Sequence, residues 1–226
     1  MYCLHFNEID STNKYLKENF DSLENFTFVS SDYQSGGKGR ENRVWLSNKS
    51  ENLLFSFLIK DESLLKKFNV LSIGTATLIA RFLELKGLKN VSVKWPNDVY
   101  VNDKKICGIL LEGNIDKFLA IGAGLNVNQT KFDGDYRVDP TSMKIELKED
   151  INLEALEVEL FEFIFKHINQ KLFSKKTFEF LSTHNYLLNK KVKAGNAIGK
   201  VSGITKDFEL LIDDVAINSQ EIAILY

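Results

Sequence analysis

The chain has 226 residues, of which 44% are hydrophobic and 27% are charged, and its formal net charge is −2. This composition is typical of a folded protein with a core, and the charge excludes a basic field that would attract nucleic acid or an anionic membrane. No apolar stretch reaches the roughly 18 residues of a membrane-spanning helix. Two cysteines, Cys3 and Cys107, are too few for a disulfide scaffold, and no secretory signal is expected near Met1. We therefore expect a cytoplasmic protein.

The first 190 residues contain both short apolar runs, typical of strands, and helical patterns. Strands are predicted over 2–6, 26–31, 53–59 and 117–124. Helices are predicted after the N-cap cluster at 10–13, over 68–86 with Gly87 at the end, over about 152–172 and over about 174–186. Strands with helices packed around them favour an α+β fold over alternating βαβ units.

From Lys190 onwards the chain changes to short apolar runs separated by glycines and by Asp213-Asp214. Such a pattern is typical of a small β-barrel. We therefore predict two domains. Residues 1–187 form a mixed β-sheet packed with helices, and residues 188–226 form the small C-terminal barrel.

The segment 94–112 is the most informative part of the sequence. Lys94-Trp95-Pro96-Asn97-Asp98 puts a cation and an Asn-Asp pair beside a strand, and the turn residues Asn102-Asp103 lead to a second strand that opens with Lys104-Lys105. A hairpin of this kind can aim a lysine at a carboxylate or phosphate beside the Asn-Asp corner. A hairpin lysine is more often a solvated edge residue, however, and Cys107 more often a small buried side chain.

A second candidate segment is the basic, glycine-bearing loop 36–43. Its glycines let the backbone approach a ligand, and Lys38, Arg40 and Arg43 supply charge for a phosphate or carboxylate. The loop is not a P-loop, because the GxxxxGK[ST] pattern is absent. Taken alone, it is more often a solvated loop. Trp45 just after it is either a core tryptophan or an aromatic platform for a nucleobase.

Taken together, these segments resemble the bacterial biotin–protein ligases, also called biotin–acetyl-CoA-carboxylase ligases. The matching motifs stand in the family's order: Ser11-Thr12-Asn13, Gln34, Gly37-Lys38-Gly39-Arg40, Trp45, Lys94-Trp95-Pro96-Asn97-Asp98, Lys105-Ile106-Cys107-Gly108-Ile109-Leu110 and Gly122-Ala123-Gly124-Leu125-Asn126-Val127-Asn128. The resemblance is strong over residues 8–128 and weak over the C-terminal barrel. It implies a ligase catalytic domain followed by an SH3-like barrel.

The resemblance also implies a two-step reaction. The biotin carboxylate attacks the α-phosphate of ATP, which gives biotinyl-5′-AMP and pyrophosphate, and a lysine of a biotin carboxyl carrier protein of acetyl-CoA carboxylase then attacks the mixed anhydride. Such a protein needs no covalent nucleophile. It has to position two anions and neutralise their charge.

Site residues follow from the same resemblance. The implied biotin-binding residues are Ser11, Thr12, Asn13, Gln34, Lys38, Gly39, Arg40, Lys105 and Gly108. The implied ATP- and adenylate-binding residues are Lys38, Arg40, Trp45, Asn97, Asp98 and Asn126. Lys105 and Arg40 are implied as catalytic, and Lys105 would bind the biotin carboxylate and then the phosphate of the adenylate. Mg²⁺ is the expected metal, with Asp98 as its protein ligand.

The loop departs from the family pattern at two places. Lys38 stands where the family usually has arginine, so the bidentate fork is lost. Glu41-Asn42 replaces the usual Arg-Gly, and Glu41 could pair with either Arg40 or Arg43. Because the Ser11-Thr12-Asn13 motif lies so early, we expect a form without the DNA-binding domain that some members carry. We also expect no DNA partner, no membrane partner, and a monomer or weak homodimer.

Two other functions remain open. A lipoate–protein ligase would share the catalytic core, and thermal shift with biotin against lipoate would separate the two enzymes. A non-catalytic biotin-binding module would bind biotin without releasing pyrophosphate. The complete set of Gln34, Arg40, Lys105, Asn97 and Asp98 favours an enzyme over such a module.

Overall fold

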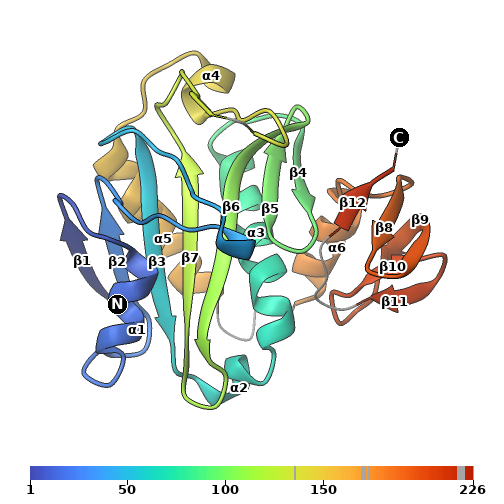
Figure 1. Cartoon of the computed structure of the whole chain (residues 1–226), viewed down its shortest axis with the longest axis horizontal. Helices are drawn as coiled ribbons and strands as arrows, with labels where there is room; N and C mark the ends of the chain where they lie inside the picture. Colours follow the sequence, from blue (N-terminus) through green and yellow to red (C-terminus); the bar gives the residue numbers. More distant parts are fainter. Residues whose placement is uncertain (135, 169–171, 173, 218–221, 226) are drawn as a thin grey trace.

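The computed structural model describes residues 1–134, 136–168, 172, 174–217 and 222–225. Its main body is a seven-stranded mixed sheet in the order β1-β2-β3-β7-β6-β5-β4 (Figure 1). The strands are β1 (Tyr2–Phe6), β2 (Thr27–Ser31), β3 (Asn52–Ile59), β4 (Val91–Lys94), β5 (Asp98–Val101), β6 (Lys104–Asn114) and β7 (Phe118–Asn126). β1 and β2 are parallel, and the other neighbours are antiparallel.

Helices cover both faces of this sheet. In Figure 1, α1 (Thr12–Asn19) lies in front, whereas α3 (Phe68–Leu85) and α5 (Leu153–His167) lie behind. Phe161 of α5 packs its ring 4.6 Å from that of Phe28 and 5.0 Å from that of Phe55, which joins the helix to β2 and β3 in the main core. The remaining helical elements are η1 (Arg40–Asn42), α2 (Glu62–Leu65), α4 (Met143–Leu147) and α6 (Lys175–Thr183).

The C-terminal part is a five-stranded antiparallel sheet in the order β11-β10-β9-β8-β12. Its strands are β8 (Lys191–Ala194), β9 (Ala197–Ile204), β10 (Leu210–Ile212), β11 (Val215–Ile217) and β12 (Ile222–Ile224). The buried Trp95 donates from its indole Nε1 to the carbonyl of Phe208, 3.0 Å away. The corner after β4 therefore fastens the small sheet to the large one.

The α+β class is confirmed, and the predicted element types are borne out with small shifts at their ends. The N-cap prediction is confirmed, since the Ser11 hydroxyl accepts from Lys14 N at 3.4 Å. Gly87, at a φ of 95°, follows α3 as expected for a helix stop. The helix predicted over 152–172 is described as α5 up to His167, and residues 169–171 lie outside the described residues. Helices α2 and α4 were not predicted from the sequence.

Candidate active site

A cavity of about 890 Å³ lies on the front face of the large sheet. Its walls come from β6 and β7, from the start of α1, from the segment that joins β2 to β3, and from β12 of the small sheet. In Figure 1 the joining segment crosses in front of β3 and β7 and carries η1 over β6. All the residues predicted to form the site line this one cavity: Ser11, Thr12, Asn13, Gln34, Lys38, Gly39, Arg40, Trp45, Asn97, Asp98, Lys105, Gly108 and Asn126.

Glycines form the floor of the cavity. Gly108 of β6 is paired with Gly124 of β7, and the indole of Trp45 covers both. A Cβ atom at Gly124 would lie 2.4 Å from Trp45 Cε2, and one at Gly108 would lie 2.9 Å from Trp45 Cζ3. Contacts that short are impossible, so larger side chains here would displace the indole. The two glycines thus give a flat aromatic group access to the sheet.

Lys105 reaches this floor because of a β-bulge. Asp98 pairs with Gly108 and Tyr100 pairs with Lys105, so Ile106 is an extra residue on β6. Side chains alternate between the faces of a strand, and the extra residue brings Lys105 to the same face as Gly108. Its ammonium lies 2.8 Å from Asp98 Oδ1 and 5.5 Å from the centroid of the Trp45 ring. A cation therefore stands beside the aromatic platform, paired with one carboxylate.

The start of α1 supplies neutral polar groups. The Thr12 backbone N–H and hydroxyl both donate to Gln34 Oε1, at 2.7 and 3.0 Å, and the Thr12 and Ser56 hydroxyls lie 2.6 Å apart. The Gln34 oxygen is thus occupied, which leaves its NH₂ group for a ligand. Asn13 lies next to Gly122, two residues before Gly124 on β7. The polar groups therefore lie beside Gly122, two residues along β7 from the point where Trp45 covers Gly124.

The basic loop is tied to the turn after β4. Arg40 donates to Asn97 Oδ1 at 3.3 Å, and Asn97 Nδ2 donates to the carbonyl of Ile109 at 2.9 Å. Glu41 forms an ion pair with Arg43, so of the two arginine partners considered from the sequence the structure selects Arg43. The loop closes on itself, because Gly39 N donates to the carbonyl of Arg43 at 2.7 Å. Lys38 and Arg40, which flank Gly39 in the sequence, both line the cavity.

Asn126 lies at the far end of the floor, two residues beyond Gly124. Its Nδ2 donates to the carbonyl of Thr141 at 3.0 Å, while its buried Oδ1 has no hydrogen-bond partner among the described residues. The indole Nε1 of Trp45 is likewise buried and without a partner in the described part of the chain. Unsatisfied buried polar atoms are costly, and a ligand in the cavity could pair with them.

Part of the wall was not foreseen from the sequence. Phe132, the segment 136–140 and strand β12 also line the cavity, with Tyr136, Arg137 and Ile224 among their residues. Lys105 positions this segment, since its backbone N–H donates to the carbonyl of Asp139 and its carbonyl accepts from Thr141 N, both at 2.9 Å. Arg137 is one of only four arginines in the sequence, and that scarcity was the one signal pointing to it.

Neither a metal-binding cluster nor a membrane-spanning helix is found among the described residues. No group of three or more His, Cys, Asp or Glu side chains there could hold a metal ion. In the part of the chain that the structure describes, Asp98 and Glu41 are the carboxylates that line the cavity. Within the same residues, no helix combines the length and the apolar character needed to cross a bilayer.

The sequence matches a family model, described as the Biotin/lipoate A/B protein ligase family, over residues 5–128. The chain belongs to this family. The match covers more than half of the 226 residues and ends with the Asn126-Val127-Asn128 segment of the site. It spans the residues that line the cavity from the large sheet, whereas β12 and the segment 132–140 lie beyond it.

The chain is similar in sequence to several biotin–protein ligases and ligase/repressors of bacteria and plants. The chain is 36% identical over 124 residues to the bifunctional ligase/repressor BirA of Escherichia coli, which is 53% of this chain and 38% of that protein. It is 35% identical over 130 residues to biotin–protein ligase 2 of Arabidopsis thaliana, which is 53% of this chain and 39% of the relative. The chain thus spans about two fifths of the length of these relatives.

Among family structures, the chain is similar over its whole length to a biotin protein ligase from Aquifex aeolicus in complex with biotin and ATP. The TM-score is 0.81 and the sequence identity 27%, with 99% of this chain and 98% of the other covered. A Helicobacter pylori biotin acetyl coenzyme A carboxylase synthetase with bound biotinylated ATP has the same fold, at a TM-score of 0.65, 21% identity and coverage of 96% and 99%. The similarity includes the small C-terminal sheet.

Proposed function

We propose that this chain is an ATP-dependent biotin–protein ligase. It would activate biotin as biotinyl-5′-AMP and transfer the acyl group to a lysine of a biotin carboxyl carrier protein. The observation that supports this most strongly is the shared cavity. Its floor carries, in order along β7, the polar groups beside Gly122, the Trp45 platform over Gly124, and Asn126. The polar groups suit a cyclic urea, the platform and Asn126 suit adenine, and the Lys105 ammonium lies beside the platform, 5.5 Å from the centroid of the Trp45 ring.

In the first step a carboxylate oxygen of biotin would attack the α-phosphorus of ATP. A carbon–oxygen–phosphorus anhydride forms, the bond to the β-phosphate breaks, and pyrophosphate leaves. The Lys105 ammonium would hold the carboxylate and then the adenylate phosphate. Lys38 and Arg40, on the loop that reaches the wall, would neutralise the remaining phosphate charge. No side chain has to form a covalent bond, so catalysis comes from placement and electrostatics.

In the second step a deprotonated lysine of the carrier would attack the carbonyl carbon of the anhydride. An amide forms and AMP leaves with the electrons of the broken carbon–oxygen bond. The basic loop would have to keep water from the anhydride until the carrier arrives. The Arg40–Asn97 contact supports that role, since it fastens the loop across the cavity.

Mg²⁺ would be held by Asp98 together with substrate phosphates. The donor set fits, because Mg²⁺ in nucleotide sites commonly takes one or two carboxylates and completes its shell with phosphate oxygens and water. Asp98 is partly buried on the cavity wall, next to the Lys105 ammonium. The ion would neutralise charge on the phosphates, and Asp98 would orient both it and Lys105.

Transfer to a carrier tests this proposal. The protein is incubated with ATP, labelled biotin and a biotin carboxyl carrier domain, and the domain is analysed by intact mass. We expect a mass increase of one biotinyl group on the carrier lysine, dependent on ATP, and none on a carrier with that lysine replaced by arginine. A parallel reaction with lipoate and a lipoyl domain tests the alternative within the family. Lipoylation without biotinylation would contradict the proposal.

A further inference from the structure

The amide of Asn13 is held in one orientation. Its Nδ2 donates to Glu112 Oε2 at 2.9 Å and to the carbonyl of Leu110 at 3.3 Å. Rotation of the amide by half a turn would face its oxygen toward two acceptors, so that orientation is disfavoured. Asn13 is only 4% exposed, and its Oδ1 has no hydrogen-bond partner among the described residues. The side chain therefore presents a buried acceptor at the cavity wall.

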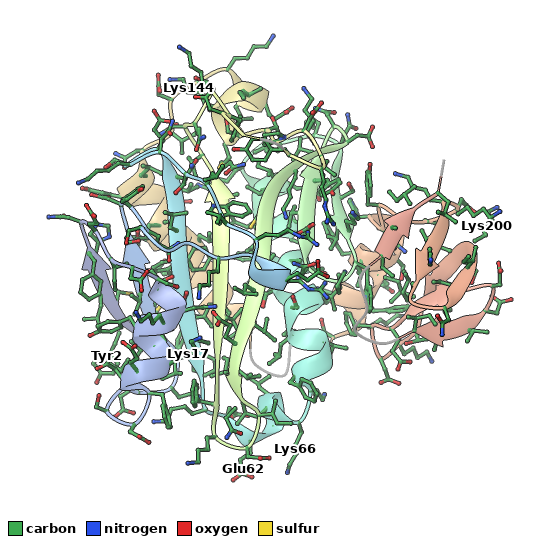
Figure 2. All side chains as sticks on the ribbon, in the orientation of Figure 1. Tyr2, Lys17, Glu62, Lys66, Lys144 and Lys200 are labelled. Carbon is green, nitrogen blue, oxygen red and sulfur yellow. The ribbon has the colours of Figure 1, made fainter. Side chains whose placement is uncertain are left out.

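Glu112 is itself held from the other side. Lys17 Nζ lies 2.5 Å from Glu112 Oε1, while Glu112 Oε2 accepts from Asn13. Burial raises the pKa of the Glu112 carboxyl, but the hydrogen bonds from Lys17 and Asn13 outweigh it and lower the pKa below its usual range. Lys17 lies on α1, in front of the sheet in Figure 2. Lys17, Glu112 and Asn13 thus form a chain of contacts from the surface to the cavity, which we call the Asn13 relay.

The strand beside the relay leaves room for it. A Cβ atom at Gly122 would lie 2.7 Å from Asn13 Oδ1 and 3.0 Å from Asn13 Cγ. Gly122 pairs with Leu110, whose carbonyl accepts from Asn13, and Gly124 pairs with Gly108, over which Lys105 reaches. The Asn13 side chain therefore meets β6 at Leu110 and the Lys105 side chain meets it at Gly108. These two positions are two residues, or roughly 7 Å, apart along the strand. A ligand with a polar ring and an acidic tail could contact both.

We propose that Glu112, held by Lys17, is a positioning residue that keeps the Asn13 amide oxygen available to an N–H donor on the ring of the acid substrate. The cavity would in this way select a cyclic urea, which has such donors, over a dithiolane ring, which has none. The inference rests on the proposed function and deepens it, because the family includes ligases for both kinds of acid.

The reason is the cost of an unpaired buried acceptor. A ring without donors would fill the cavity and leave Asn13 Oδ1 unpaired, which corresponds to a loss of affinity of about tenfold or more. Sites built to hydrogen-bond a ligand reject analogues that lack the bonding group more strongly than apolar pockets reject a small change of shape. Without Glu112 the amide could rotate and offer its NH₂ group in place of its oxygen, so that a cyclic urea would lose its acceptor whereas a dithiolane ring would lose no hydrogen bond.

Calorimetry on the full chain tests this with three acids: biotin and dethiobiotin, which share the urea, and lipoate, which has the acidic tail alone. We expect Glu112→Ala to weaken binding of both ureas by about tenfold and to change lipoate binding by less than about twofold. Glu112→Gln, which keeps one acceptor oxygen, should stay within about threefold of the wild type for all three acids. Glu159→Gln, in the Lys86–Glu159 ion pair on the far side of the sheet, is the matched control and should change none of them.

Kinetics give a second readout. In biotin-dependent ATP–pyrophosphate exchange, Glu112→Ala should raise the KM for biotin about tenfold and leave kcat and the KM for ATP within about twofold, because Lys105 and the loop are untouched. Equal weakening for biotin and lipoate would show a merely structural effect and would overturn the inference, as would unchanged biotin binding. If Glu112→Ala does not fold, Lys17→Met provides the same comparison with an expected shift of about threefold. Inactive wild-type protein would overturn the proposed function itself, so the two failures are distinguishable.

Discussion

The Lys105 ammonium lies 2.8 Å from the Asp98 carboxylate, across the β5–β6 ladder and beside the Trp45 ring. The cation is therefore held in place before any substrate arrives, and an incoming carboxylate meets an ammonium that is already oriented. Holding a charged group in its working position lowers the reorganisation needed in the transition state. The proposed mechanism therefore depends strongly on Lys105 and Asp98.

Lys105→Ala should slow adenylate formation severely and leave the fold intact. Removing one charge-assisted contact should cost about 2–4 kcal/mol of transition-state stabilisation, or roughly 30- to 1000-fold in the rate of exchange. Single-turnover formation of the adenylate measures this. Lys104→Ala, at the exposed neighbouring lysine, is the matched control and should behave as the wild type. A Lys105→Ala protein that exchanges at the wild-type rate would remove Lys105 from the mechanism.

Arg40→Gly should let the adenylate escape. The substitution removes the 3.3 Å contact with Asn97 that fastens the loop across the cavity, while the groups beside Asn13 remain. We expect biotin binding to persist, adenylate dissociation to accelerate by about tenfold or more, and bystander lysines to become labelled. Rapid filtration of preformed complex measures the rate, with Arg81→Gln on α3 as the control arginine. Dissociation no faster than in the wild type would show that Arg40 does not close the cavity.

Lys38→Arg should have the opposite effect. A guanidinium can contact a phosphate through two parallel hydrogen bonds, whereas the lysine ammonium acts as a single point charge. We expect the adenylate to dissociate more slowly by about twofold to fivefold, as one added charge-assisted hydrogen bond would give at a partly exposed site. The same filtration assay measures it, and faster dissociation than in the wild type would contradict the assignment of Lys38 to the phosphate.

Glu112 should make stability depend on pH. The lowered pKa of its carboxyl means that the folded state binds its proton less tightly than the unfolded state, so Glu112 stabilises the fold above the ordinary carboxyl pKa of 4.5. That contribution is lost as the pH falls below 4.5 through the folded-state pKa. Glu112→Gln should therefore lower the midpoint concentration of urea-induced unfolding at pH 6.5 more than at pH 3.5. A larger loss at pH 3.5 would reverse the sign and contradict the relay.

The two cysteines should differ in reactivity. Cys107 is fully buried on β6, and burial raises the pKa of its thiol, whereas Cys3 is exposed on β1. Thiolates rather than thiols react with alkylating reagents. At pH 8 we expect one cysteine, Cys3, to be alkylated in the folded protein and both in denaturant. Labelling of Cys107 before unfolding, located by peptide mass spectrometry, would show that β6 opens in the native state.

Trp95→Phe should weaken the attachment of the small sheet. The substitution keeps an aromatic ring in the core but removes the indole donor and leaves the Phe208 carbonyl without it. We expect a loss of about 1–2 kcal/mol in the free energy of unfolding, measured with urea. Phe178, whose ring also contacts that of Phe208, remains in place as a second link.

The elements could be predicted from the sequence because local rules decide them. Ser11 caps α1, Gly87 follows α3 in a left-handed conformation, and Asn102-Asp103 both have positive φ, as a tight hairpin requires. Ser142 also caps α4, with Glu146 in its first turn, and this signature could have identified the helix that was missed.

The geometry of the site depends on features that local rules do not reveal. Lys105 and Gly108 are three positions apart, so strict alternation places them on opposite faces of β6, and the extra residue Ile106 reverses this. Lys17 and Glu112 are 95 positions apart, and only the packing of α1 on the sheet joins them. The cavity residues on the large sheet, on α1 and on the basic loop were predictable by resemblance, whereas the segment 136–140, β12 and the contacts that orient the side chains were not.

Biotin-dependent exchange of labelled pyrophosphate into ATP tests the central claim most directly, because it requires the acid and the nucleotide to react in one cavity without any carrier. We predict exchange with biotin, little or none with lipoate, and loss of exchange in Lys105→Ala. Biotin binding without exchange, or exchange that follows lipoate instead of biotin, would contradict the account.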